Sequence, residues 1–333
     1  MCQSVYTLSK YYQNNRFHVM NTTKTIKRIL AASDLSEHAD YAVYRAAQLA
    51  AQHKAKLFLL HVIDEELSDQ SLLELIKKGP NAVADELSKA AVASLQKQAD
   101  ALAAEHFFDY CVHVEEGKEL VNIINQARDE QVDLIVLGAH GKYYFRDVFL
   151  GTTAEKAVRK SGRSVLVVRN LSEVPYARIL VTVDFSETSR QVLSLAMTLA
   201  PDADLYVLHA YQRQPLKDEK ATAIFDATKD YEGFKTQLEN QAKLRLDQFL
   251  DEFDFGARHV ERIVKCGYPP NIIRMVAEEQ KADLTLVGAN SHSDMQHFML
   301  GDTAEHALRE LPCDVLVVRT PPLESGFTES EQD

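Results

Sequence analysis

The sequence predicts an α/β fold that occurs twice, as two tandem open parallel sheets with helices on both faces. Three observations support this prediction. A shift of 150 residues aligns one half of the chain with the other. Within each half, short apolar runs alternate with stretches of helical spacing. The apolar runs are continuous and rich in β-branched residues, which is typical of parallel strands covered on both faces.

The internal repeat is visible residue by residue. RILAASDLSE at 28–37 matches RILVTVDFSE at 178–187, and 16 of the 37 positions in 133–169 are identical in 283–319. A constant register over such a span predicts two copies of one domain. We therefore divide the chain into four parts. The two repeats span 25–170 and 175–320. An extension at 1–24, which we expect to be flexible, precedes them, and an acidic tail at 321–333 follows them.

Each element of the repeat has its own signal. The first strand is an apolar run that ends at Asp34, and Ser36 then suits the start of a helix. The segment 81–104 is rich in Ala, Leu, Lys and Gln at helical spacing, and we expect it to cover the sheet. In the first repeat the expected strands are 28–33, 57–63, 109–115, 133–138 and 164–169, and the expected helices are 37–53, 70–105, 119–130 and 152–161. In the second repeat the expected strands are 178–183, 204–210, 260–266, 283–288 and 314–319.

Composition excludes several classes of protein. The formal net charge is −12, and an acidic chain is a poor general binder of nucleic acid or of anionic lipid. The chain contains no uncharged apolar run near the roughly 20 residues that a membrane-spanning helix needs, so we expect no membrane insertion. Its 4 cysteines lie far apart without a CxxC pair, and residues 1–20 lack the apolar stretch of a secretory signal. These features predict a protein of the cytoplasm.

A glycine-containing loop follows the fourth strand of the first repeat. Gly138, Gly141 and Gly151 have the spacing G-x2-G-x9-G, and Thr152 and Thr153 then open a helix. We expect Gly138 and Gly141 to permit a left-handed backbone and the close approach of a phosphate. The free N–H groups at the helix start attract anions, and the two threonine hydroxyls can add hydrogen bonds.

These residues, together with Asp34 and the turn at Gly117, resemble the universal stress protein family in its tandem two-domain form. The resemblance covers nearly the whole chain except the two ends. It implies a Rossmann-like parallel sheet of strand order 3-2-1-4-5 in each repeat, so that Asp34 and the glycine loop share one crevice. It also implies ATP as the ligand, with Mg²⁺ on the phosphates. The implied nucleotide-binding residues are Ala32, Ser33, Asp34, Val62, Gly138, His140, Gly141, Lys142, Gly151, Thr152 and Thr153.

The second repeat departs from this pattern. Ser291 replaces the second glycine, and Asp302 replaces the threonine at the helix start. If that glycine position needs a positive φ, a serine costs about 1–2 kcal/mol there. A carboxylate at the helix start repels a phosphate, unless a divalent cation bridges the two. We therefore expect the second repeat to bind triphosphate poorly, with weak equivalents of the site at Asp184, Gly288, Gly301 and Thr303.

Other interpretations stay open. Asp34 is also suited to capping a helix, and the glycine loop to being only a tight turn. The chain would then be an interaction scaffold that uses no nucleotide. Rapid catalysis is not supported, because the sequence contains neither a G-x4-G-K-(S/T) loop nor a G-x-S-x-G elbow, so at most slow ATP hydrolysis is expected. His292 and His297 match no strong zinc signature, and we expect no metal centre in the protein itself.

The fifth strand of each repeat raises a question of assembly. The apolar runs 165–168 and 315–318 would be aggregation-prone edges if they were left bare. The family resemblance implies pairing through these strands. We expect them to pair either within the chain, as a pseudo-dimer, or across a homodimer.

Overall fold

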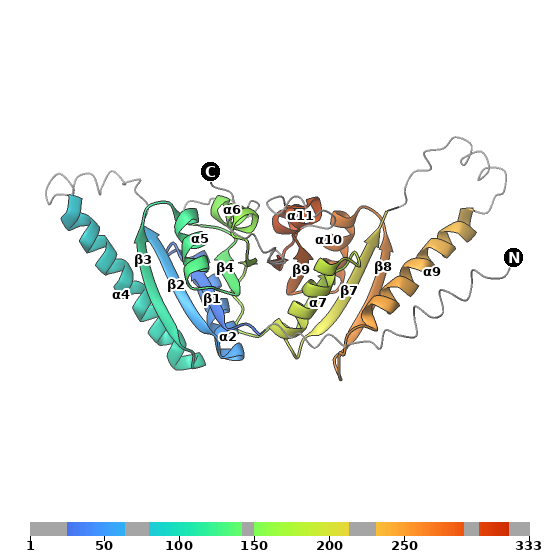
Figure 1. The fold of residues 1–333 in the computed structure, drawn as a ribbon, viewed down its shortest axis with the longest axis horizontal. Coiled ribbons are helices and arrows are strands. Elements are labelled where there is room, and N and C mark those ends of the chain that lie inside the picture. Colours follow the sequence, from blue (N-terminus) through green and yellow to red (C-terminus); the bar gives the residue numbers. More distant parts are fainter. Residues whose placement is uncertain (1–24, 64–79, 142–149, 213–230, 290–299, 320–333) are drawn as a thin grey trace, which may run out of the picture.

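Ten strands form one mixed sheet whose two halves meet at its centre (Figure 1). The computed structural model describes residues 25–63, 80–141, 150–212, 231–289 and 300–319. The first repeat contains β1 (Arg28–Ala32), α2 (Glu37–His53), β2 (Lys56–Ile63), α4 (Pro80–His106), β3 (Tyr110–Glu116), α5 (Glu119–Asp129), β4 (Leu134–Gly138), α6 (Thr152–Lys160) and β5 (Ser164–Val168). The second contains β6 (Arg178–Thr182), α7 (Glu187–Leu199), β7 (Asp204–Tyr211), α9 (Tyr231–Leu250), β8 (Val260–Cys266), α10 (Pro269–Glu279), β9 (Leu284–Gly288), α11 (Asp302–Glu310) and β10 (Asp314–Val318).

Both repeats have the predicted strand order. The first runs β3-β2-β1-β4-β5, and the second runs β8-β7-β6-β9-β10. All pairs inside a repeat are parallel, with β1 between β2 and β4, so that Leu30 lies opposite both Phe58 and Ile135. The α/β prediction with order 3-2-1-4-5 is confirmed. It places the carboxyl ends of β1 and β4 side by side, which is where open α/β sheets bind ligands.

The fifth strands pair within the chain, the first of the two arrangements expected for them, and β5 and β10 thereby join the two parallel sheets into one. These two strands pair antiparallel, with Leu166 opposite Leu316. Every residue of both strands is buried. Each strand thus covers the other's unpaired N–H and C=O groups, which would otherwise form an exposed apolar edge. The strands β3 and β8 lie at the two ends of the joined sheet, beside α4 and α9 (Figure 1).

The helices cover the sheet on both faces. One buried apolar cluster joins α2, α4, α7 and α9 to one face, and a second joins α5, α6, α10 and α11 to the other. Each cluster contains residues of both repeats, so the core is continuous across the junction. Segment 81–104 lies in α4, whose Leu95 and Ala99 are fully buried, as expected of a helix that covers the sheet. The start predicted for this helix, at 70, lies outside the described residues.

A buried polar cluster lies beside the junction. Tyr176, in the segment that connects the repeats, donates a hydrogen bond of 2.6 Å to Oδ2 of Asp314, which opens β10. Arg45 of α2 lies 3.9 Å from the same oxygen, with its guanidinium 4.0 Å from the centre of the Tyr176 ring. All three residues are buried. The connecting segment is therefore held against α2 and β10 by specific polar contacts.

No helix in the described part of the chain is long and apolar enough to span a membrane.

Candidate functional site

Asp34 and the glycine loop meet in the first repeat. Asp34 follows β1, and Gly138 ends the neighbouring β4. A Cβ atom added to Gly141 would lie 3.0 Å from Oδ2 of Asp34. The loop therefore closes directly on the carboxylate. Oδ1 of Asp34 accepts the N–H of Ser36 at 3.0 Å and holds the turn before α2, whose N-cap is Ser36 and not Asp34.

The glycines serve close packing and not a left-handed backbone. Neither Gly138 nor Gly141 has a positive φ, so that expectation was wrong. A Cβ on Gly138 would lie 3.1 Å from the carbonyl oxygen of His38, in the first turn of α2. The positive φ of this region falls on Leu35, at 61°. The strain predicted for Ser291 therefore finds no support at the equivalent Gly141, and Ser291 itself lies outside the described residues.

The start of α6 carries no side-chain cap among the described residues. The N–H of Gly151 donates to the carbonyl of Ala139 at 2.7 Å, and Gly151 is the N-cap of α6 without a side chain to cap it. Thr152, the first residue of α6, is exposed. The free N–H groups of the first turn and the positive end of the helix dipole favour a negative group there.

One residue next to the start of α6, Glu119 of α5, was not among the predicted site residues. The Thr153 hydroxyl donates to Oε2 of Glu119 at 2.7 Å, where Glu119 opens the neighbouring helix α5. A carboxylate thus lies beside the expected phosphate position. The sequence carried no signal for it, because the contact depends on how α5 packs against α6.

The ends of β1 and β2 carry two of the predicted residues. Ala32 and Val62 lie at the carboxyl ends of these strands, half-buried and almost fully buried respectively. Ser33 is 5% exposed, and its hydroxyl accepts the N–H of Leu35 at 3.1 Å. Ser33 therefore holds the turn, and its side chain offers little surface to a ligand.

His140 and Lys142 are the two remaining predicted residues of the loop. The half-buried His140 ring lies 5.7 Å from the ring of His38, in edge contact. His38 thereby joins the site, although the sequence analysis did not single it out. Lys142 lies outside the described residues, as do His292 and His297 of the second repeat. Across the described ranges, no cluster of three or more His, Cys, Asp or Glu residues has the arrangement of a metal site.

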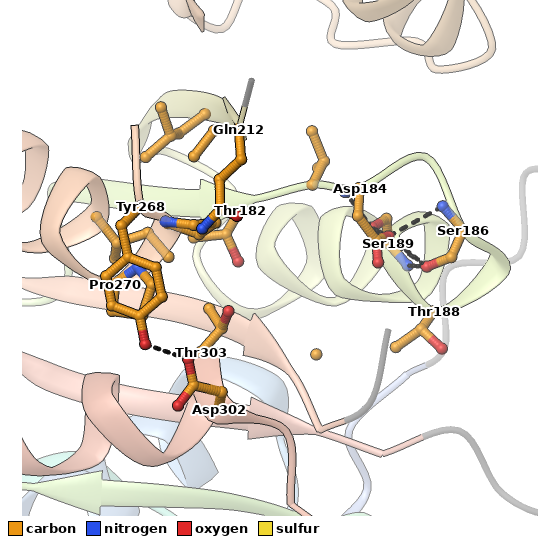
Figure 2. A pocket seen from close by; sticks show the side chains of 16 residues that line it. Thr182, Asp184, Ser186, Thr188, Ser189, Gln212, Tyr268, Pro270, Asp302 and Thr303 are labelled. Carbon is orange, nitrogen blue, oxygen red and sulfur yellow. Dashed lines mark hydrogen bonds between the residues drawn. The ribbon is translucent and has the colours of Figure 1, made fainter. Parts of the chain in front are cut away.

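The second repeat contains a cavity of about 450 Å³ at the equivalent place (Figure 2). It lies beyond the ends of β6 and β7, next to the starts of α10 and α11. Of the four predicted equivalents, Asp184, Gly288 and Thr303 line it, and Gly301 is the N-cap of α11. The cavity is therefore bordered by the residues that the repeat pattern indicated.

Asp184 is held firmly at one side of this cavity. Its Oδ1 accepts the N–H of Ser186 at 3.0 Å and the hydroxyls of Ser186 at 2.5 Å and Ser189 at 2.6 Å. The Ser189 hydroxyl also accepts the N–H of Asp184 at 2.9 Å. Three hydrogen bonds to Oδ1, together with the backbone bond to Ser189, thus fix the carboxylate in one orientation, as the dashed lines of Figure 2 show in part.

Asp302 meets a phenol that the sequence analysis did not consider. The Tyr268 hydroxyl donates a hydrogen bond to Oδ2 of Asp302, drawn as a dashed line in Figure 2. This bond to a carboxylate raises the pKa of Tyr268 above its usual value of 10.0. The His306 Nδ1 lies 3.2 Å from the other Asp302 oxygen. The first residue of α11 is therefore engaged within the protein.

A model of the Universal stress protein family matches residues 25–169 and 175–319. The chain belongs to the universal stress protein family. The universal stress protein E homolog of Haemophilus influenzae is 23% identical over 319 residues, which cover 88% of this chain and 97% of that protein. The tandem arrangement inferred from the internal repeat is thus shared with a relative along almost the full length of both.

Solved structures share the fold of this tandem universal stress protein. A universal stress protein from Archaeoglobus fulgidus has a TM-score of 0.59 at 21% identity, covering 88% of this chain and 98% of that one. A functionally unknown protein from Pseudomonas aeruginosa has a TM-score of 0.60 at 19% identity, covering 91% and 95%. At such identities the likeness shows the architecture and carries no residue roles.

Proposed function

We propose that this universal stress protein is a cytoplasmic regulatory module that binds ATP with Mg²⁺ in its first repeat. The observation that carries the proposal is the closure of Gly141 on Asp34 beside the uncapped start of α6. Backbone N–H groups, a glycine without a side chain and a helix dipole together suit a phosphate group. Magnesium supplies positive charge to the phosphates, next to the carboxylates of Asp34 and Glu119. At most slow hydrolysis is expected.

The second repeat is proposed to serve mainly in structure or in partner binding. Asp302 places a negative charge where the first repeat has Thr152, at the start of the equivalent helix. Such a carboxylate occupies the position that favours an anion and repels a phosphate. The two repeats should therefore differ in their affinity for ATP.

The test is calorimetric titration of nucleotide-stripped full-length protein with ATP and magnesium. We expect about one site per chain. Gly141→Asp should abolish binding, because any Cβ there already lies 3.0 Å from Oδ2 of Asp34 and the new charge repels phosphate. The matched control is Ser291→Asp at the equivalent position of the second repeat, which should keep ATP binding. Undiminished affinity in Gly141→Asp would remove the site from the first repeat.

One contact favours a second candidate, an interaction scaffold that uses no nucleotide. The Thr153 hydroxyl is bonded to Glu119, which keeps a carboxylate next to the expected phosphate position. ATP must displace or neutralise this carboxylate in order to bind. Absence of any heat with ATP, with and without magnesium, would favour the scaffold.

A further inference from the structure

The cavity of the second repeat is not used by the function proposed above. Its volume of about 450 Å³ is within the range of small-molecule sites. Figure 2 shows Asp184 with its serines at one side and the Tyr268–Asp302 pair at another. The cavity is large enough for a small molecule, and the residues that line it indicate the chemistry of that molecule.

The charge of the lining disfavours an anion. The charged side chains among the described lining residues are Asp184 and Asp302, and no Lys or Arg is among them. Asp302 is the first residue of α11, where its carboxylate takes the place of an external anion at the positive end of the helix. The Tyr268 hydroxyl is donated to that carboxylate, so it is not presented to a ligand phosphate.

The first repeat shows that these features are specific to the second. Tyr268 and Asp302 stand where the first repeat has Lys118 and Thr152. The second repeat thus has a phenol bonded to a carboxylate where the first repeat has a lysine and a threonine. The start of α11 is thereby occupied by a carboxylate of the chain itself, which borders the cavity that extends beyond β6 and β7.

The hollow part combines apolar surface with hydrogen-bond acceptors. Leu208, Ala210 and Ile273 supply apolar surface. Three donors of the chain converge on Oδ1 of Asp184. The Gln212 amide both donates and accepts, and the Thr182 hydroxyl, which donates to the carbonyl oxygen of Leu286 at 3.2 Å, can still accept. This lining suits an uncharged molecule with a flat or apolar part and with hydroxyl or amine donors.

We propose that the second repeat binds an unphosphorylated, nucleoside-like small molecule and rejects its phosphorylated forms, because Asp302 and Tyr268 fill the phosphate position. The choice of adenosine as the probe rests on the function proposed for the first repeat. One chain would then carry two sites of opposite preference, one for a nucleotide and one for its uncharged counterpart.

The test compares adenosine with magnesium–ATP by calorimetry on the full-length protein. Two variants narrow matching positions at the ends of β7 and β2, Ala210→Phe in the cavity and Val62→Phe in the first repeat. Ala210→Phe should weaken adenosine binding at least tenfold and leave the ATP site unchanged. Val62→Phe should weaken ATP binding and leave adenosine bound in the second repeat. Thermal melting of each variant verifies the fold.

A further variant, Asp302→Asn, tests the proposal without placing a larger side chain in the cavity. Asp302→Asn removes the negative charge at the start of α11 and keeps an oxygen that accepts from Tyr268. It should create a second ATP site, with at least a tenfold gain in affinity for ATP and little change for adenosine. The proposal would be overturned if Ala210→Phe left the affinity for adenosine unchanged. It would also be overturned if the Asp302→Asn protein still bound one ATP per chain.

The outcomes separate this proposal from the proposed function. Adenosine binding that responds to Ala210→Phe, in a protein that binds no ATP, would refute the function of the first repeat and support the second site. ATP binding in the first repeat, without adenosine binding in the second, would refute the second site and support the function proposed for the first repeat.

Discussion

Tyr176 shows how one residue outside any strand or helix holds the two repeats together. Its ring lies under the Arg45 guanidinium, and its hydroxyl is bonded to Asp314. Burial, together with the neighbouring carboxylate, raises the pKa of Tyr176 well above 10.0. Burial also raises the pKa of Asp314, although several donors point at it. Both shifts reflect burial, so each polar side chain of the cluster relies on the others as its bonding partners.

Tyr176 should contribute stability that disappears in alkali. Its folded pKa is raised, so the contribution is present below pH 10 and is lost as pH rises towards the folded pKa. Tyr176→Phe leaves Asp314 short of one donor and should cost about 1–3 kcal/mol at pH 7. Urea denaturation at pH 7, 9 and 10.5 measures both effects. The variant should lose less stability than the wild type between pH 9 and 10.5. Parallel losses would show that Tyr176 does not titrate as described.

At the scale of elements, α6 and α11 meet across the junction through four charged side chains. Arg159 pairs with Glu155 at 3.2 Å and with Glu305 at 3.0 Å, and Arg309 pairs with Glu155 at 3.4 Å and with Glu305 at 3.1 Å. The four pairs close a ring that links the helices of the two repeats. Their side chains are partly exposed, so each pair is worth less than a buried one.

A double-mutant cycle on Arg159→Gln and Glu305→Gln should give a coupling of about 0.5 kcal/mol at low salt. Salt screens partly exposed charges, and at 0.5 M salt the Debye length is about 4 Å. The coupling energy should therefore fall towards zero at that salt concentration. The matched control is the pair of Lys243 and Glu239, 2.7 Å apart within α9 alone. Denaturant unfolding of the single and double variants measures both cycles. A coupling that is unchanged by salt would contradict this account of the ring.

At the scale of the whole molecule, the junction of β5 with β10 decides the architecture. It turns two five-stranded parallel sheets into one sheet with an antiparallel centre. The two apolar cores continue across it. Each repeat thus covers the strand edge that the other would leave bare.

Residues 25–169 expressed alone should not remain a well-behaved monomer. Removing the second repeat uncovers β5, whose Val165, Leu166 and Val167 are paired with β10 in the full chain. The fragment should dimerise through this edge or aggregate. Light scattering after size-exclusion chromatography distinguishes these outcomes, with the full-length protein as the control. A stable monomer at micromolar concentration would show that the pairing is not needed to protect β5.

The repeat, the α/β class and the approximate position of each strand could all be predicted from the sequence. Local information suffices for these, because the alignment at 28–37 and 178–187 and the continuous apolar runs need no knowledge of distant contacts. It also pointed to Asp34 and the glycine loop, since the residues that follow parallel strands gather at one edge of a sheet.

Tertiary structure alone decided how the two repeats combine and what surrounds each site. The pairing of β5 with β10, the bond from Thr153 to Glu119 and the bond from Tyr268 to Asp302 join positions far apart in the sequence. Their geometry depends on how whole helices and strands pack. The role of the glycines was misjudged for the same reason: Gly138 and Gly141 are required by their neighbours in space, His38 and Asp34, and not by their own backbone angles.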